Sequence, residues 1–278
     1  MCRLSLTQTL RLDFENGTRQ EVGSGQGYYL VDFDTGSPQP ATNYQTFEGV
    51  DGALDMGTIF GPRTLTATFL ITSRDHVDVV LLQREIWQLF FQREAYYITW
   101  SEMPGMRWLV HLKPFEYTRI NILDATVTIE FDAFKGYAES VGATQDAFTF
   151  DAGLWQTGQG LIGEDFTYTF HTNKFSVYNA GDIAIDPREH ELVIVIKGES
   201  EGQMRMTNHE TSDVFVYEPA FNKADEIKID GVYPKRNGIH AGRNTNHGLI
   251  RLCPGWNKIE IQGVREVYAR FFFRFLYQ

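Results

Sequence analysis

The chain has 278 residues, which is more than one hydrophobic core usually accommodates. Its composition, 42% hydrophobic and 22% charged, is that of a folded protein. Its net charge of −11 at pH 7 excludes a protein that binds nucleic acid through a basic face, because such binding needs clustered Lys and Arg. Aromatic residues reach 14%, and such side chains favour strands and fill β-sandwich cores or interfaces. We therefore expect two mainly β domains and no specific nucleic-acid partner.

The cysteines and the N-terminal segment bear on the compartment. Cys2 and Cys253 lie near opposite ends of the chain without a CxxC partner, so we expect reduced, unpaired thiols. The segment MCRLSLTQTLRLDF alternates polar and apolar residues and has no uninterrupted apolar core. It predicts neither a secretory signal nor a membrane span. A protein of this kind that works outside a cell would leave by another route, such as release in a virion by host lysis.

The first domain, residues 1–135, is predicted to consist of strands, one helix and further strands. Asp75 is a candidate N-cap for a helix over HVDVVLLQREIWQLFFQRE, because apolar side chains fall on one face at helical spacing. These side chains are Val79, Leu82, Ile86, Leu89 and Phe90. Patterns of period two predict strands over Leu4–Phe14, Tyr28–Phe33, Thr64–Thr72, Tyr96–Ser101, Arg107–Thr118 and Ala125–Phe134.

Residues 34–63 interrupt this pattern with many Gly and Pro residues, and we expect a long loop, of a kind that is often functional. Within it, the segment 43–63 carries large apolar side chains that would be costly to leave in water. Our hypothesis is that the loop orders against a neighbouring subunit; the alternative is a disordered surface loop. The candidate interface residues are Tyr44, Phe47, Met56, Ile59 and Phe60.

Residues 136–145 (GYAESVGATQ) are predicted to link the two domains, and residues 146–278 show no helix of useful length. Evenly spaced short strands between turn signals are typical of a β-sandwich. The expected strands are Phe166–His171, Leu192–Gly198, Gln203–Thr207, Val214–Tyr217, Glu226–Ile229, Leu249–Leu252, Asn257–Gly263 and Glu266–Tyr277.

A search for chemistry finds no catalytic motif: GxSxG, Walker-type phosphate loops, HExxH and paired CxxC are all absent. His240 and His247 are the nearest approach to a metal pair, but no Asp or Glu lies between them as a third ligand. We interpret them as part of a polar surface loop. We therefore expect no enzyme activity, no cofactor and no metal.

Three aromatic residues of the second domain are candidate contacts for a glycan or a protein partner: Trp155, Tyr233 and Trp256. Together they could form a platform on which sugar rings stack. They could equally be core or hinge residues. The sequence leaves both interpretations open.

Several stretches resemble the distal tail protein family of siphophages, mostly those that infect Gram-positive bacteria. In the first domain they are EGVDGALDMGTIFGPRTLTATFLI, DHVDVVLLQREIWQLFF, MPGMRWLVHLKPFE and DATVTIEFDAFKGYAES. In the second domain, YNAGDIAIDPREHELVIVIKG resembles that family's entry into a galectin-like sandwich. The Asn237-Gly238 turn and the segment LCPGWN before a strand fit the same pattern. The resemblance spans nearly the whole chain in order.

The resemblance implies a tail-tube-like first domain with one α-helix and a galectin-like β-sandwich as the second domain. Such proteins form a hexameric ring at the tail tip, which joins the major tail protein and the tape-measure protein to the tail-tip protein. The second domain would project outward and anchor receptor-binding proteins. The location implied is the virion tail tip, after assembly in the host cytoplasm, with DNA passing through the channel. From the net charge alone, our hypothesis is that an acidic channel repels the passing DNA.

Two alternatives to a ring subunit stay open. The first is a carbohydrate-binding module for host cell-wall glycans, although the galectin sugar motif His-x-Asn-Pro-Arg is absent. The second is a glycan hydrolase with an unrecognised site.

Overall fold

In the computed structural model, the residues described are 8–25, 27–115, 117–148, 153–155, 158, 161 and 166–278. The chain divides into two compact units, Met1–Ala138 with Gln278 and Glu139–Tyr277. Strands dominate the described residues of both units, and α1 (His76–Phe90) is their one α-helix. The expectation of a mainly β protein is therefore confirmed. Leu4, Leu6 and Cys2 lie outside the described residues.

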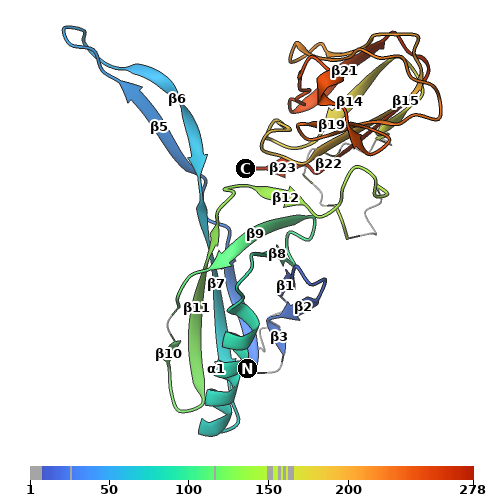
Figure 1. Ribbon diagram of the computed structural model, residues 1–278. Helices are drawn as coiled ribbons and strands as arrows, with labels where there is room; N and C mark the ends of the chain where they lie inside the picture. The colour runs from blue at the N-terminus through green and yellow to red at the C-terminus, as the bar shows by residue number, and fades with distance from the viewer. Residues whose placement is uncertain are drawn as a thin grey trace. The chain divides into compact units, whose positions relative to one another are not determined.

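The first unit is built on antiparallel strands that follow one another across a sheet (Figure 1). From one edge to the other they are β2 (Arg19–Val22), β1 (Leu10–Asp13), β8 (Tyr96–Trp100), β9 (Met106–Leu112), β11 (Asp124–Ala133), β7 (Arg63–Thr72), β4 (Tyr28–Asp34) and β3 (Ser24–Gly25). A short strand, β10 (Tyr117–Arg119), pairs with β11. The Phe33 ring of β4 contacts Trp100 and Trp108 of β8 and β9, at 5.5 and 6.3 Å between centroids. Side chains from strands that are not neighbours in the sheet order thus share one core.

The centre of this core is the long pair β7–β11, in which buried residues alternate with more exposed ones over ten residues. The register places Leu65 opposite Phe131, and both are fully buried. Such period-two alternation is typical of a strand with one face on a core. The strands predicted over Thr64–Thr72 and Ala125–Phe134 are confirmed to within one or two residues.

Helix α1 begins where it was predicted. The Asp75 carboxylate accepts hydrogen bonds from the backbone N–H groups of Val77 and Asp78, at 2.8 and 2.9 Å, as an N-cap does. At the other end the Phe90 ring lies 5.7 Å from Phe69 of β7 and 5.8 Å from Phe131 of β11. The predicted apolar face covers the sheet, with only Leu89 half-buried, and the helix ends four residues earlier than the predicted segment.

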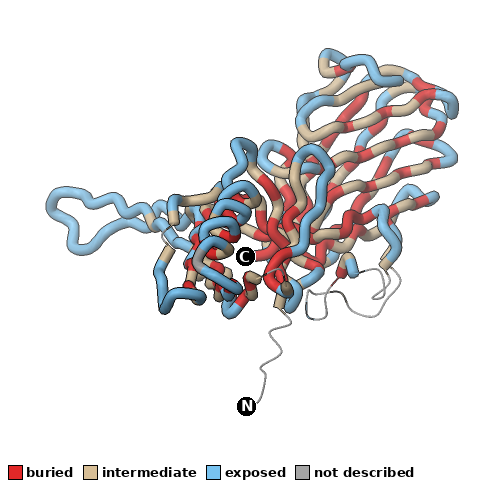
Figure 2. The backbone as a smooth tube through the Cα atoms, turned by 90° about the horizontal axis from the view of Figure 1, so that it is seen from below, coloured by how far each residue is buried: buried red, intermediate tan, exposed pale blue. Residues whose placement is uncertain are grey.

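The expected loop over residues 34–63 is instead mostly a β-hairpin, and that prediction is wrong. Strands β5 (Gln39–Gln45) and β6 (Leu54–Gly61) pair with each other and extend away from the rest of the first unit (Figure 1). Nearly every residue of both strands is exposed (Figure 2). Because neither face lies on a core, the segment lacks the alternation that identifies a strand from sequence.

The second unit is a sandwich of two antiparallel sheets. One sheet has the order β13 (Thr169–Phe170), β22 (Arg265–Phe273), β15 (Leu192–Glu199), β18 (Ile227–Asp230), β19 (Tyr233–Arg236) and β20 (Ile239–His240). The other has the order β14 (Lys174–Asn179), β21 (Gly255–Gln262), β16 (Met204–Asn208) and β17 (Asp213–Tyr217). Rings from the two sheets meet inside: Phe175 of β14 lies 5.9 Å from Phe271 of β22.

The expected linker, residues 136–145, is largely part of the second unit. A short strand, β12 (Ala138–Ser140), lies at the boundary, and Ser140 and Thr144 are buried. The Ser140 backbone N–H donates to the Phe275 carbonyl and the Thr144 hydroxyl donates to the Phe271 carbonyl. The single strand expected over Glu266–Tyr277 is two strands, since residues 274–275 lie between β22 and β23 (Leu276–Tyr277).

A buried carboxylate makes the second unit sensitive to acid. Hydrogen bonds from the Arg236 guanidinium, the Asn222 backbone N–H and the Asn237 amide hold the pKa of Asp225 below its ordinary value of 3.8. A depressed pKa contributes stability that is present above the unfolded-state pKa and is lost as the pH falls through the folded-state pKa. We expect the thermal midpoint of this unit to fall between about pH 4 and about pH 2.

Asp225→Asn should make that fall shallower, measured by calorimetry, because the variant has no carboxylate at position 225 to protonate. Glu189→Gln, at an exposed position, is the control and should leave the slope unchanged. An Asp225→Asn protein with the same acid slope as the wild type would show that other groups carry the effect.

Candidate functional site

The five predicted interface residues all lie on the β5–β6 hairpin and all are exposed. Their exposed fractions run from 50% to 67% in the order Phe60, Phe47, Met56, Ile59 and Tyr44. Ile59 and Phe60 are adjacent on a strand and so point to opposite faces, which leaves apolar side chains on both sides. Two further exposed apolar residues of the hairpin, Val50 and Leu54, were not singled out from sequence.

The base of the hairpin is tied to the body of the first unit. Arg63, at the start of β7, is buried, and its Nε donates to the Gly136 carbonyl at 3.0 Å. Gly136 has φ +73°, and a Cβ there would lie 2.5 Å from the Gly61 carbonyl oxygen. Only glycine fits this close approach without strain. The hairpin is therefore held at its base, while its two strands pair with each other and are mostly exposed.

Helix α1 presents a second apolar surface, which the sequence reasoning missed. Opposite the face that covers the sheet, about half of each of five apolar side chains is exposed. These residues, which we call the α1 stripe, are Val77, Val80, Leu81, Trp87 and Phe91. The four helical positions of the stripe lie on one side of α1 by their spacing, and Phe91 is the C-cap residue that follows the helix. A helical-wheel count of the second apolar stripe could have found it.

The three candidate aromatic residues of the second unit do not form one platform. Trp155 is 4% exposed, its ring stacks on Phe148 at 4.5 Å, and its Nε1 donates to the Ala147 carbonyl. It is a core residue and cannot stack on a sugar. Tyr233 and Trp256 are 59% and 48% exposed, but they lie on β19 and β21, which belong to different sheets. The platform hypothesis is corrected accordingly.

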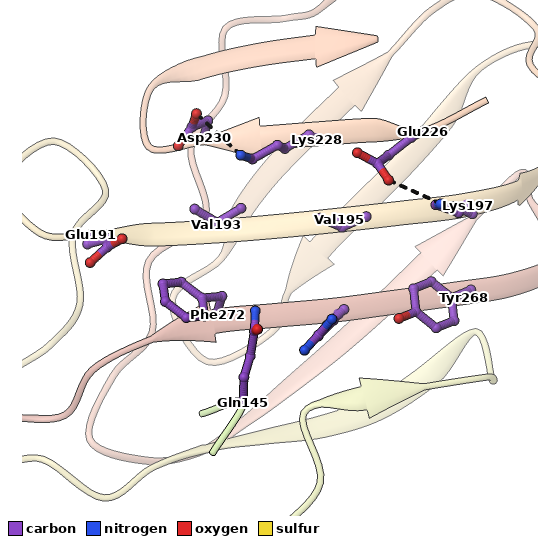
Figure 3. A pocket seen from close by; sticks show the side chains of 11 residues that line it. Gln145, Glu191, Val193, Val195, Lys197, Glu226, Lys228, Asp230, Tyr268 and Phe272 are labelled. Carbon is purple, nitrogen blue, oxygen red and sulfur yellow. Dashed lines mark ion pairs between the residues drawn. The ribbon is translucent and has the colours of Figure 1, made fainter. Parts of the chain in front are cut away.

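A pocket of ≈770 Å³ lies instead on the outer face of the six-stranded sheet (Figure 3). Alternate residues of β22, β15 and β18 form its floor, in rows that follow the strand register. The rows are Phe272–Val193–Asp230, Arg270–Val195–Lys228 and Tyr268–Lys197–Glu226, with Gln145 and Glu191 at the rim.

The structure adds little to the search for catalytic chemistry. Among the described residues, no group of three His, Cys, Asp or Glu side chains could hold a metal ion, and both His240 and His247 lie near the surface. Cys253 is a free, half-buried thiol. In the part of the chain that is described, no helix is long and apolar enough to cross a membrane.

Comparison with known families defines the class of the first unit. Residues 16–133 match the family described as a phage tail protein RIFT-related domain. No curated protein matches the chain.

Comparison with solved structures covers both units. The chain is similar over 96% of its length to 99% of Dit from phage SPP1, with a TM-score of 0.69 and 13% identity. That protein is described as a paradigm of the hub adsorption apparatus in phages that infect Gram-positive bacteria. A chain of the phage P2 baseplate, in its activated conformation with Ca, matches over 96% of this chain and 98% of its own length. Its TM-score is only 0.43 and its identity 8%, so no conclusion is drawn from that match. The fold is thus that of a siphophage distal tail protein, and the resemblance drawn from sequence is confirmed.

Proposed function

We propose that the chain is a non-enzymatic structural subunit of a phage tail tip that assembles into a hexameric ring. The ring would join the major tail protein and the tape-measure protein to the tail-tip protein, and the second unit would anchor receptor-binding proteins. The support is the phage tail domain over residues 16–133 together with the distal tail protein fold of the whole chain. The location proposed is the virion tail tip, after assembly in the host cytoplasm.

The observation that carries the ring is the exposed apolar hairpin β5–β6. A hairpin whose strands pair only with each other buries no core of its own, yet this one carries seven exposed apolar side chains. They are Tyr44, Phe47, Val50, Leu54, Met56, Ile59 and Phe60. Contiguous exposed apolar residues of this kind mark interaction sites. Contact with a neighbouring subunit would remove these side chains from water.

A closed ring needs two different surfaces on each subunit, because each subunit contacts one neighbour in front and another behind. The first unit carries two separate apolar surfaces, the hairpin and the α1 stripe. The hairpin is acidic, since it contains Glu48, Asp51 and Asp55 and no Lys or Arg. The α1 stripe, by contrast, has a basic residue beside it, because the spacing of Arg84 places it on the same side of the helix. Both surfaces serve as subunit or tail-partner contacts in this proposal.

A charged residue in the α1 stripe tests the helix surface. We expect Leu81→Glu to weaken assembly at least about tenfold, since burying a charge without a partner is unfavourable, while the thermal midpoint stays unchanged. The measurement is sedimentation velocity over a range of concentrations. Ile239→Glu is the control, because Ile239 is 75% exposed on the second unit and belongs to neither surface. Equal assembly by Leu81→Glu and wild type would remove the stripe from the proposal.

Electron microscopy of the purified chain tests the ring itself. Class averages should show particles with six-fold symmetry and a central channel. Particles of another closed symmetry, or isolated subunits in the presence of the tail-tip partner, would contradict the proposed hub.

A further inference from the structure

The pocket on the outer face of the six-stranded sheet, with its rows from β22, β15 and β18, lies wholly in the second unit. Its volume of ≈770 Å³ falls in the range of small-ligand sites. The floor residues Val193, Val195 and Phe272 are half-buried, although they belong to the face of the sheet that points away from the core. They line the pocket beside charged side chains of the same three strands, so a ligand there would contact both apolar and charged groups.

The cations of the pocket differ in their carboxylate partners. Lys197 pairs with Glu226 at 3.1 Å, and Lys228 lies 3.6 Å from Asp230, as Figure 3 shows. The Asp230 carboxylate is shared, because it also accepts a hydrogen bond from Lys235 at 2.6 Å. Arg270 lies in the central row, next to Val195, and no carboxylate in the described part of the chain pairs with it. A guanidinium remains charged at all ordinary pH values and binds carboxylate or phosphate through two parallel hydrogen bonds. The pocket is therefore suited to a ligand with an anionic group.

Two aromatic rings flank this cation. Tyr268 and Phe272 are two residues before and after Arg270 on β22, so they share its face at about 7 Å spacing along the strand. The imidazole of His171 packs edge-on against the Tyr268 ring, at 5.5 Å. Flat rings beside paired charges and the Gln145 amide offer both apolar faces and hydrogen-bonding groups. Sugar rings present the matching combination of an apolar face and a rim of hydroxyl groups.

The topology argues against a peptide as the ligand. An extended peptide binds a sheet by adding to a free edge strand, where backbone groups are unpaired. Here β22, β15 and β18 are all interior strands, each paired on both sides. Recognition in the pocket must therefore come from side chains alone, which suits a compact polar ligand.

We propose that this pocket binds a saccharide that carries a carboxylate or a phosphate, with Arg270 binding the anion and Tyr268 and Phe272 contacting the sugar. This site is distinct from the platform of Trp155, Tyr233 and Trp256, and it does not depend on ring assembly. Acidic sugars and sugar phosphates share this chemistry, and the choice of probe distinguishes them.

Calorimetric titration of the full chain tests the site with trigalacturonic acid, glucose 1-phosphate and neutral maltotriose. We expect at least one anionic probe to bind with one molecule per chain and to bind more tightly than maltotriose. Arg270→Gln should weaken that binding at least about tenfold, because a charge-assisted hydrogen bond is lost. Tyr268→Ala should also weaken it. Arg243→Gln removes the same charge from an exposed position in the short turn Gly242–Asn244 and should bind as the wild type does.

Binding of trigalacturonic acid alone would assign a carboxylate sugar, and binding of glucose 1-phosphate alone would assign a sugar phosphate. The proposal is overturned if neither anionic probe binds, or if a tri-aspartate peptide binds equally well. It is also overturned if Arg243→Gln and Arg270→Gln weaken binding to the same extent, since net charge would then explain the effect. Thermal midpoints equal to the wild type confirm that each variant is folded.

Discussion

Shortening the β5–β6 hairpin is expected to abolish assembly while leaving the first unit folded. The shortened variant joins Thr42 to Thr58 through Asn-Gly, a sequence that favours the two-residue turn of a β-hairpin. Thr42 and Thr58 are opposite each other in the register, and their hydroxyl oxygens lie 2.9 Å apart. The deletion therefore keeps the residue pairs of β5 and β6 from Thr42 and Thr58 inward, together with the hydrogen bond between Arg63 and Gly136 at the base.

The size of the expected effect follows from the side chains removed. Tyr44, Phe47 and Met56 are lost, each of which contributes about 1.5–3 kcal/mol when fully buried. Even two such contacts correspond to association weakened by about a hundredfold or more at each interface. Sedimentation velocity measures the assembly, and circular dichroism melting measures the fold.

A second variant separates the effect of the apolar side chains from the effect of the length of the hairpin. Tyr44→Ser, Phe47→Ser and Met56→Thr together keep the length of the hairpin but remove its apolar groups. Loss of assembly in both variants would assign the interface to these side chains. Loss in the shortened variant alone would assign it to the backbone or to the remaining residues. Full assembly by the shortened variant would show that the hairpin is not a subunit contact.

Replacement of Trp155 by Ala is expected to destabilise the second unit by about 3–5 kcal/mol, the usual cost of deleting a large buried ring. The ring packs on Phe148 and lies 5.8 Å from Phe275, and a Cβ on Gly142 would lie 2.5 Å from its Cζ2. The absence of a side chain at Gly142 makes room for the indole. Denaturant unfolding of the second unit measures the loss.

Trp256→Ala provides the comparison, because Trp256 is half exposed and its removal should change stability far less than removal of Trp155. A Trp155→Ala protein with unchanged stability and weakened glycan binding would restore Trp155 as a ligand contact. It would also contradict its assignment to the core.

The sequence predicted best those elements whose local pattern reports a buried face. The alternation of Leu65 to Ile71 and of Ala125 to Ala133, and the cap at Asp75, are local signals, and each was confirmed. The hairpin failed as a secondary-structure prediction for the converse reason, since both its faces are exposed and no period results. Its apolar composition still identified it as a candidate interface, and that assignment stays a prediction.

The pocket and the burial of Trp155 could not be predicted, because both depend on long-range pairing. Val195 and Arg270 become neighbours only through the register of β15 with β22. The sequence gives no signal that distinguishes Trp155 from Tyr233 and Trp256, and only the fold shows that the first ring is buried and the other two are exposed. Patterns along the chain identify faces of strands, whereas the order of strands in a sheet decides which faces meet.

The central claim, a ring built from this chain, is tested most directly by the mass of the purified protein in solution. Light scattering on a sizing column, over a range of concentrations and with the tail-tip partner added, gives that mass. The account predicts a hexamer, or a dimer of hexamers, formed alone or once the partner is present. A strict monomer under all of these conditions would contradict it.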